Sequence, residues 1–413
     1  MTLLRFLADW RSSRAHRAAL AVARAAAARG DWAAGLRACE AALASRPADA
    51  DAWWLKGGLL LRMNAVQAAA RAYALHAEIL EAPVATRVLR LAMLDPARAA
   101  QGLPYYCQLT DVLVDTAHWT VIAGDRMYAA DVHGRNPANN PFVAGRITPD
   151  GETVVFSAPA PTSTIDAPVV LVGGDENYSH WLFRNLLKLC ALDAAGLLYQ
   201  RPWLVNEDLA PWQRDMLALL GIDEMQRITV KRNEVIRCRD VLVPALLTSS
   251  SAIAQGVAWL RERCAAHCVP EAQARDLLFV SRADATRRRV LNEDALRQRL
   301  EARGFRTVVA AGMDVYAQKR VFSSARLVVA IHGAALTNMI FSPAHARFVE
   351  LCGSRWASMS EFRRLAKARG QRIDTLICDR YPADASPNDP HADHYVDVDA
   401  VMASVERLLA DDY

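Results

Sequence analysis

The stretch LVVAIHGAALTNMIFSPAHARFVEL, residues 327–351, decides how this chain is expected to fold. Its first five residues are apolar and predict a buried strand. The small residues Gly333, Ala334 and Ala335 predict a tight turn into a helix, and residues 348–350 predict the next strand. Free backbone N–H groups and the positive end of the helix dipole would meet at this turn. The pattern predicts an anion site at a sheet edge, although an ordinary strand-loop-helix unit remains an alternative.

Length and composition narrow the class of protein. The chain has 413 residues, enough for two or three domains, and a net charge of only +4, which does not suggest a nucleic-acid binder. No apolar run approaches the roughly 20 residues that span a bilayer, and the N-terminus does not resemble a signal peptide. We therefore expect a cytoplasmic protein with at most peripheral membrane contact. Cys264 and Cys268 lie four residues apart, but idle thiols are expected there, and neither a metal nor a cofactor is predicted.

The first region, residues 1–100, is Ala-rich and is expected to be helical. It repeats with a period of 34, since Gly35 and Ala69 share a small-residue position and Cys39 and Tyr73 share the next inward position. These positions resemble the tetratricopeptide repeat, which implies a module that could bind a protein partner. A plain set of helical hairpins remains the alternative. Residues 1–46 hold eight Arg and three acidic residues, which favours an acidic partner or anionic membrane face, or simply a solvated basic surface.

The next segments change from helical to strand-forming character. YYCQLTDVLV, HWTVIAG and RMYAADV predict short strands between residues 104 and 160, with a hairpin turn at Gly124-Asp125. Residues 134–141 are rich in Asn, Pro and Gly and predict a loop. We expect a small β-rich section that leads into the next domain.

From about residue 165 onward, predicted strands alternate with predicted helices. Such alternation produces parallel sheets that are covered on both faces. A break near residues 246–270 divides the pattern into two Rossmann-like domains, expected at 101–248 and 249–413. The last helix, residues 398–409, is expected to pack back on the first of these domains.

Two further motifs lie at predicted strand ends. NYSHWL, residues 177–182, follows a strand and a Gly-Gly turn, so His180 is expected at a sheet edge, where it could act as a base near neutral pH. Asp175 and Glu176 on the same loop are rival bases. SRADATRRRVLNE, residues 281–293, follows another strand, and its arginines suit a diphosphate because guanidinium groups pair with phosphate oxygens. A solvated arginine run remains the alternative reading of this segment.

Taken in order, NYSHWL, SRADATRRRVLNED, HGAALTN and FSPAHARFVEL resemble glycosyltransferase family 61 over residues 165–360. The resemblance implies an α/β fold of the GT-B type and an inverting, metal-independent transfer of a sugar. The donor would be a nucleotide-sugar, with a UDP-sugar favoured, and the acceptor a glycan of surface polysaccharide biosynthesis. The donor would bind the C-terminal domain and the acceptor the N-terminal one.

The resemblance also implies roles for individual residues. His180 is the leading base, and the residues expected to contact the donor are Arg282, Arg287, His332, Gly333, Ala334, Ala335, Asn338 and Glu350. No GxGxxG motif follows the first strand of either block and no P-loop is present, which argues against dinucleotide or ATP chemistry.

The chain departs from the family pattern at two places. Family members often have an acidic residue shortly after HWL, where Arg184 stands here, and Glu-Gln before the HGA strand, where Ala317-Gln318 stands here. Either change could move the base or alter the donor. They could also mark a catalytically inactive scaffold protein that acts through its helical repeats, and this alternative stays open.

Overall fold

The computed structural model divides the chain into two compact units, each of which is described by itself. Unit 1 comprises Met1–Pro96, Cys107–Leu171 and Val230–Val243, and unit 2 comprises Ala97–Tyr106, Val172–Thr229 and Pro244–Tyr413. The structure describes residues 3–82, 84–133, 146–357, 361–382, 389 and 391–410, with side chains from residue 13 onward. The loop predicted at 134–141 lies outside the described residues. In the part of the chain so described, no helix has the length and apolar character to cross a bilayer.

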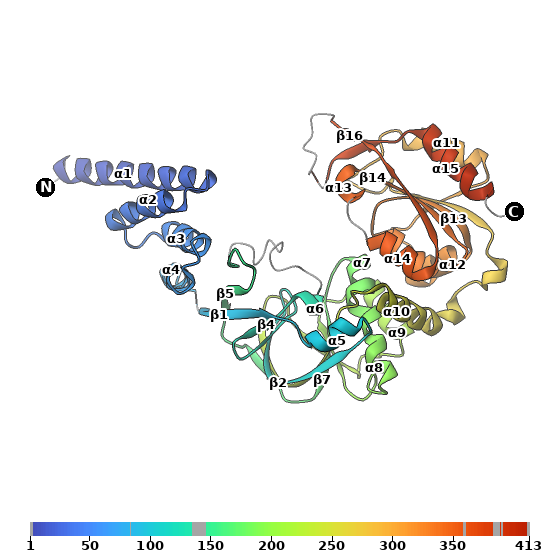
Figure 1. Ribbon diagram of the computed structural model, residues 1–413, viewed down its shortest axis with the longest axis horizontal. Helices are drawn as coiled ribbons and strands as arrows, with labels where there is room; N and C mark the ends of the chain where they lie inside the picture. The colour runs from blue at the N-terminus through green and yellow to red at the C-terminus, as the bar shows by residue number, and fades with distance from the viewer. Residues whose placement is uncertain are drawn as a thin grey trace. The chain divides into compact units, whose positions relative to one another are not determined.

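Unit 1 begins with helices α1 (Leu3–Ala28), α2 (Trp32–Ser45), α3 (Ala50–Arg62) and α4 (Val66–Ile79). Consecutive helices pack side by side (Figure 1). The side chains of Asp31 and Asp49 cap α2 and α3 by accepting hydrogen bonds from backbone N–H groups in the first turn. Cys39 and Tyr73, the inward positions predicted from the 34-residue period, are both buried. The predicted helical character is confirmed up to Ile79.

Residues 84–92 were included in the predicted helical region, and this was wrong. Strand β1 (Val84–Ala92) pairs antiparallel with β5 (Thr153–Pro159) and parallel with β4 (Arg126–Tyr128). The segment VATRVLRLA has β-branched and alternating apolar residues, which suit a strand, and Leu89 is buried in the core beneath the sheet. Pairing with β4 and β5, which are distant in sequence, therefore determines that this segment is a strand, although the Ala-rich segment before it is helical.

The rest of unit 1 is a mixed sheet. Its strands run in the order β5-β1-β4-β3-β2-β10-β7, and β6 pairs with β10. The strands not yet placed are β2 (Tyr106–Asp115), β3 (Thr120–Ala123), β6 (Ser163–Ile165), β7 (Val169–Gly173) and β10 (Val235–Pro244), and the short helix α6 (Ala130–His133) follows β4. The predicted turn at Gly124-Asp125 joins β3 and β4, which pair antiparallel. The predicted strands of residues 104–160 thus belong to this larger sheet and do not form a separate section.

Unit 2 begins with α5 (Pro96–Gln101) and then resumes at the carboxyl end of β7 with an unbroken helical run. The run consists of α7 (Tyr178–His180), the π-helix η2 (Trp181–Leu186), the 3-10 helix η3 (Leu187–Leu189) and α8 (Cys190–Ala194). The elements that follow are β8 (Trp203–Asn206), α9 (Pro211–Leu219), β9 (Arg227–Val230), α10 (Ser250–Arg263), η4 (Ala265–His267) and η5 (Glu271–Gln273). Strands and helices alternate here as the sequence predicted.

The C-terminal part of unit 2 is a five-stranded, fully parallel sheet in the order β12-β11-β13-β14-β15. Its strands are β11 (Asp276–Ser281), β12 (Arg306–Val309), β13 (Ala325–Ile331), β14 (Arg347–Cys352) and β15 (Arg372–Ile377). The other elements are α11 (Glu293–Ala302), α12 (Val315–Ser323), η6 (Ala334–Ile340), α13 (Ser354–Ala357), α14 (Glu361–Arg369), β16 (Asp379–Tyr381), β17 (Asp393–Tyr395) and α15 (Val398–Ala410). Residues 327–330 are almost fully buried, which is why this apolar run forms a central strand.

Two predictions about this part were wrong. The C-terminal helix does not pack back on the first domain. Its apolar side chains Val401, Val405 and Leu408 lie on one face and join the core of the parallel sheet, where α15 lies beside α11 (Figure 1). The helix predicted after HGAA is also shorter and tighter than an α-helix, because η6 is a seven-residue 3-10 helix.

Together these elements make a mixed α/β chain with a helical N-terminal region and large sheets.

Candidate functional site

The loop between β7 and α7 carries the residues predicted to act as a base. Gly173 has a φ of 110°, a conformation that favours glycine. A Cβ at Gly174 would lie 2.0 Å from Nδ2 of Asn206, which donates a 3.0 Å hydrogen bond to the Gly174 carbonyl. The Gly-Gly turn is therefore required by a close approach to β8, and it brings the next residue to the end of the strand.

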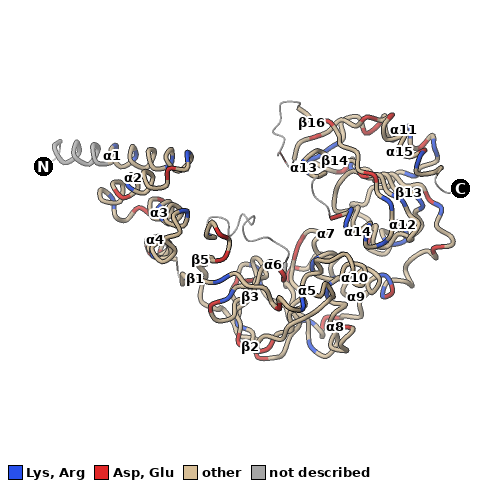
Figure 2. Tube along the Cα trace, viewed as in Figure 1, with Lys and Arg blue, Asp and Glu red and all other residues tan. Residues whose placement is uncertain are grey.

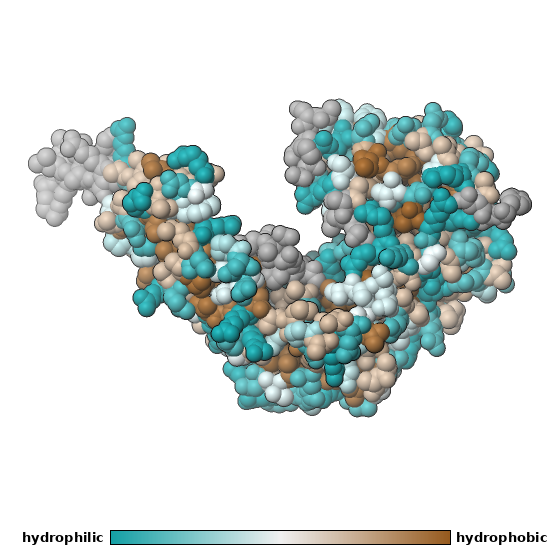
Figure 3. Space-filling view, viewed as in Figure 1, coloured by the Kyte–Doolittle hydropathy of each residue, from teal (hydrophilic) through white to brown (hydrophobic). Residues whose placement is uncertain are grey.

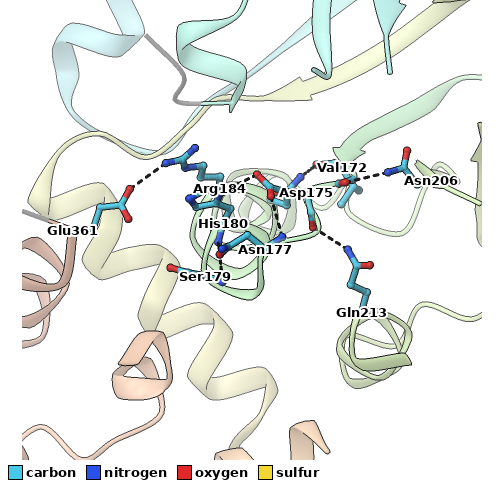
Figure 4. Close-up of polar contacts among 11 residues, drawn as sticks. Val172, Asp175, Asn177, Ser179, His180, Arg184, Asn206, Gln213 and Glu361 are labelled. Atoms are coloured by element: carbon cyan, nitrogen blue, oxygen red, sulfur yellow. Dashed lines mark hydrogen bonds and ion pairs between the residues drawn. The ribbon is translucent and has the colours of Figure 1, made fainter. Parts of the chain in front are cut away.

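Asp175 and His180 face each other across this loop (Figure 4). The His180 Nδ1 atom lies 3.2 Å from Oδ2 of Asp175, whose side chain is only 7% exposed, against 31% for His180. Asn177 fixes the loop because its Oδ1 accepts hydrogen bonds from the backbone N–H groups of Ser179 and His180. Glu176 is exposed. The structure thus joins two of the three predicted bases into a histidine–carboxylate pair.

Arg184, which stands where family members often have an acid, points to a different partner. Its Nη2 donates a 3.1 Å hydrogen bond to Oε1 of Glu361 on α14 (Figure 4). The carboxylate beside His180 comes instead from Asp175, which precedes the histidine in the sequence. An acidic residue at position 184 is therefore not needed to place a carboxylate next to His180.

A pocket of about 720 Å³ lies within unit 2. Four of the predicted donor residues line it, namely Arg282, Arg287, Ala334 and Ala335. Tyr178, Trp212 and Arg288 line it as well. The remaining predicted site residues, His180, Asp175, Glu176, His332, Gly333, Asn338 and Glu350, are not among its lining residues. Among the described residues, no three His, Cys, Asp or Glu side chains are grouped so that they could hold a metal ion.

Two guanidinium groups meet at this pocket. Burial lowers the pKa of Arg282, and burial, followed by the positive charge of Arg282, lowers the pKa of Arg288. Within the described part of the chain, Nε of Arg282 has no hydrogen-bond partner. Asp284 and Glu293 offset part of the charge of Arg282, and the two neighbouring guanidinium groups still suit a bound phosphate group.

Gly333 makes room for this arrangement. A Cβ at this position would lie 2.3 Å from Nη1 of Arg282, so any other residue would displace the guanidinium. The backbone of Gly333 is extended, with a φ of 175°, so the requirement is for space alone. Gly333 is therefore needed because it leaves space for the guanidinium of Arg282, which packs against it.

The sequence did not single out Arg288 from its arginine run. It has a φ of 55°, which is uncommon for a residue other than glycine, and its guanidinium lies 5.0 Å from the ring centroid of Trp356. It also donates a 3.5 Å hydrogen bond to the His332 carbonyl. Arg287, which was predicted, is exposed and lies 3.4 Å from Nε2 of His391. The contacts of Arg288 with His332 and Trp356, both more than forty positions away, help to distinguish it from Arg287.

His332 and Glu350 form a second histidine–carboxylate pair. The Nδ1 atom of His332 lies 2.6 Å from Oε1 of Glu350, which is 2% exposed and accepts a 3.0 Å hydrogen bond from Thr375 at its other oxygen. The ring of His332 also stacks on Trp356, with the centroids 4.9 Å apart. The structure therefore places Glu350 behind His332, in the interior of the sheet.

Asn338 links the NYSHWL segment to the wall of the pocket. It is fully buried, and its Oδ1 accepts a 2.6 Å hydrogen bond from the hydroxyl of Tyr178. Its Nδ2 donates to Oε1 of Gln318 at 2.8 Å, and Gln318 in turn donates to the carbonyl of Met313 at 3.1 Å. Gln318 is the residue of the family's Glu-Gln pair that this chain retains, and Tyr178 and Gln318 were not predicted as site residues.

Comparison with known proteins gives a family match for part of the chain. Residues 178–349 match the family model Glycosyltransferase 61. This confirms the predicted resemblance over that segment, which contains His180, His332 and the three arginines that line the pocket. The N-terminal helices lie outside the match, and it does not bear on their resemblance to tetratricopeptide repeats.

Two curated proteins of Oryza sativa subsp. japonica are similar to parts of the chain. One is a β-1,2-xylosyltransferase that is 39% identical over 84 residues, covering 20% of this chain and 14% of the relative. The other is an α-1,3-arabinosyltransferase that is 29% identical over 111 residues, covering 24% of this chain and 19% of the relative. The chain thus aligns with less than a fifth of the length of either relative.

Proposed function

We propose that the chain is a glycosyltransferase that moves a sugar from a nucleotide-sugar to a hydroxyl group of a glycan, with inversion at the anomeric carbon. The observation that carries the proposal is the meeting of Arg282 and Arg288 at a large pocket inside the segment that matches Glycosyltransferase 61. The names of the two plant relatives favour a pentose such as xylose or arabinose as the sugar. A UDP-sugar is the favoured donor.

At the donor side, positively charged side chains would stabilise the leaving group. When the bond between the sugar and the diphosphate breaks, negative charge grows on the leaving nucleoside diphosphate. Arg282 and Arg288 would neutralise this charge, and Arg287 at the pocket rim would add a third guanidinium. Since three cations are already supplied by side chains, we propose that the reaction does not require a divalent metal.

The acceptor end uses His180. We propose that Nε2 of its imidazole takes the proton of the acceptor hydroxyl as the hydroxyl oxygen forms its bond to the anomeric carbon. Asp175, 3.2 Å from Nδ1, would orient the ring and stabilise the imidazolium that results. Glu176 is exposed on the same loop, and it remains the rival candidate for the base. Glu350 and Thr375 would hold His332 in place beside Arg288 and Trp356.

The wider organisation follows from the same proposal. Residues 101–248 would form the acceptor domain and residues 249–413 the donor domain of a GT-B pair, with residues 1–100 as a tetratricopeptide-like module. The enzyme would work on the cytoplasmic side in surface polysaccharide biosynthesis, with at most peripheral membrane contact.

Calorimetry with UDP, GDP and CMP in the presence of EDTA tests the donor site. We expect UDP to bind without added metal, and addition of Mg²⁺ to leave its affinity nearly unchanged. Turnover is then measured with UDP-xylose, UDP-arabinose and UDP-hexoses and an oligosaccharide acceptor. Failure of every nucleotide to bind would remove the donor site. Binding without turnover of any donor would favour the catalytically inactive scaffold.

A further inference from the structure

A second pocket, of about 230 Å³, lies in the helical part of unit 1. Three aromatic residues contribute to it from three helices, Trp32 on α2, Trp54 on α3 and Tyr73 on α4. Aliphatic side chains such as Leu55 and Ile147 form most of the remaining wall. Trp54 is 41% exposed, and hydrophobic residues are visible along this part of the surface (Figure 3). The pocket has the size and character to hold one large apolar side chain.

Two guanidinium groups flank this aromatic pocket. Arg146 lies 4.9 Å from the ring centroid of Trp54 and 5.7 Å from that of Tyr73, and Arg62 lies 5.9 Å from that of Trp32. Among the described residues, neither guanidinium forms an ion pair with a carboxylate. Burial also lowers the pKa of Arg146, so its charge is partly removed from water without a compensating anion.

The surrounding charge has the same sign. Residues 1–46 contain eight Arg and three acidic residues, and the charged side chains of α1 from residue 13 onward are all basic (Figure 2). An acidic ligand would therefore be attracted to this side of the helices and would find two guanidinium groups at the pocket. A sugar would fit less well, because its many hydroxyl groups would meet a mostly aliphatic and aromatic wall with few hydrogen-bonding partners.

We infer that this pocket, lined by Trp32, Trp54, Tyr73 and Arg62 and flanked by Arg146, binds an acidic peptide segment of a partner protein. One apolar side chain of the peptide enters the pocket, and neighbouring carboxylates pair with the two arginines. The inference is independent of the proposed glycosyl transfer, since it depends on residues outside the segment that matches the glycosyltransferase family.

Gly58 provides a sharp test. It lies on α3 in the pocket wall, and a Cβ there would meet only the hydroxyl of Tyr73, at an ordinary 3.9 Å. Gly58→Leu should fill the pocket while favouring the helix, because leucine is a better helix former than glycine. Arg146→Gln removes the charge, and Arg37→Gln, on an exposed arginine of α2, is its matched control.

Fluorescence anisotropy of labelled short peptides with a central Phe, Trp or Leu flanked by Asp and Glu measures the affinity of the full chain. We expect at least one peptide to bind, and Gly58→Leu and Arg146→Gln each to weaken it about tenfold or more, as for loss of a charged contact. Arg37→Gln should change little, and thermal unfolding should show that all variants fold. Absence of binding by every acidic peptide, equal binding of Lys-flanked peptides, or binding of an oligogalacturonate in their place would overturn the inference.

Discussion

Substitution of Gly333 by alanine adds one methyl group and tests the donor pocket directly. The new Cβ would lie 2.3 Å from Nη1 of Arg282, well inside the ordinary contact distance of about 3.5 Å, so the guanidinium must retreat by about 1 Å. The backbone at Gly333 is extended and accepts any residue, so folding should be nearly unaffected. A displaced guanidinium loses a charged hydrogen bond to phosphate, which contributes about 1.5–3 kcal/mol. UDP affinity should therefore fall about ten- to hundredfold.

The measurement is calorimetric titration of UDP into wild type and Gly333→Ala in EDTA, together with thermal unfolding of both without nucleotide. Gly58→Ala is the matched control, because it adds the same methyl group on α3, where the new Cβ would meet only the Tyr73 hydroxyl at an ordinary 3.9 Å. Arg282→Ala should lower the affinity by a similar amount, and combining it with Gly333→Ala should add little, since both changes act on one contact. Unchanged UDP affinity in Gly333→Ala would refute the reasoning that Arg282 binds the diphosphate.

Two further predictions concern histidines. His180→Ala should lower turnover by about 10²–10⁴, the usual contribution of general base catalysis, at nearly constant UDP affinity. A larger loss of turnover in Glu176→Gln than in His180→Ala would show that Glu176, and not His180, is the base. Burial lowers the pKa of His394 below its ordinary value of 6.5, so the unfolded chain takes up the proton more readily. The stability contribution is therefore complete above pH 6.5 and is lost as the pH falls below it, and denaturant unfolding of His394→Met should show a weaker loss on acidification than wild type. The exposed His345→Met is the control, and an equal pH dependence in His394→Met and wild type would contradict the argument.

Local sequence was sufficient to predict most elements of the parallel sheet. The run at residues 327–331 forms β13, because an unbroken apolar run favours a buried strand. In the mixed sheet, the Gly-Gly turn before NYSHWL ends β7, because glycine permits backbone conformations that other residues disfavour. Four predicted donor residues also line one pocket, since turns that follow parallel strands gather at the same sheet edge.

The errors occurred where an element's partner is distant in sequence. Residues 84–92 follow an Ala-rich helical region but form β1, because β5 offers a complementary strand about seventy residues later. Helix α15 has an apolar face that could cover either sheet, and only the three-dimensional core of the parallel sheet determines which one it covers.

The residue types at the candidate site are evident from local patterns, namely a histidine after one strand, an arginine run after another, and a small-residue turn. Which of these side chains contact one another depends on the folded chain. In the folded chain Asp175 lies beside His180, Arg184 pairs with Glu361, and the buried Glu350 pairs with His332. Arg288 is also distinguished from the rest of its run, because it lies near Trp356. The physical reason is that burial and ion pairing depend on distances between segments, whereas sequence patterns report the backbone preferences and polarity of each segment alone.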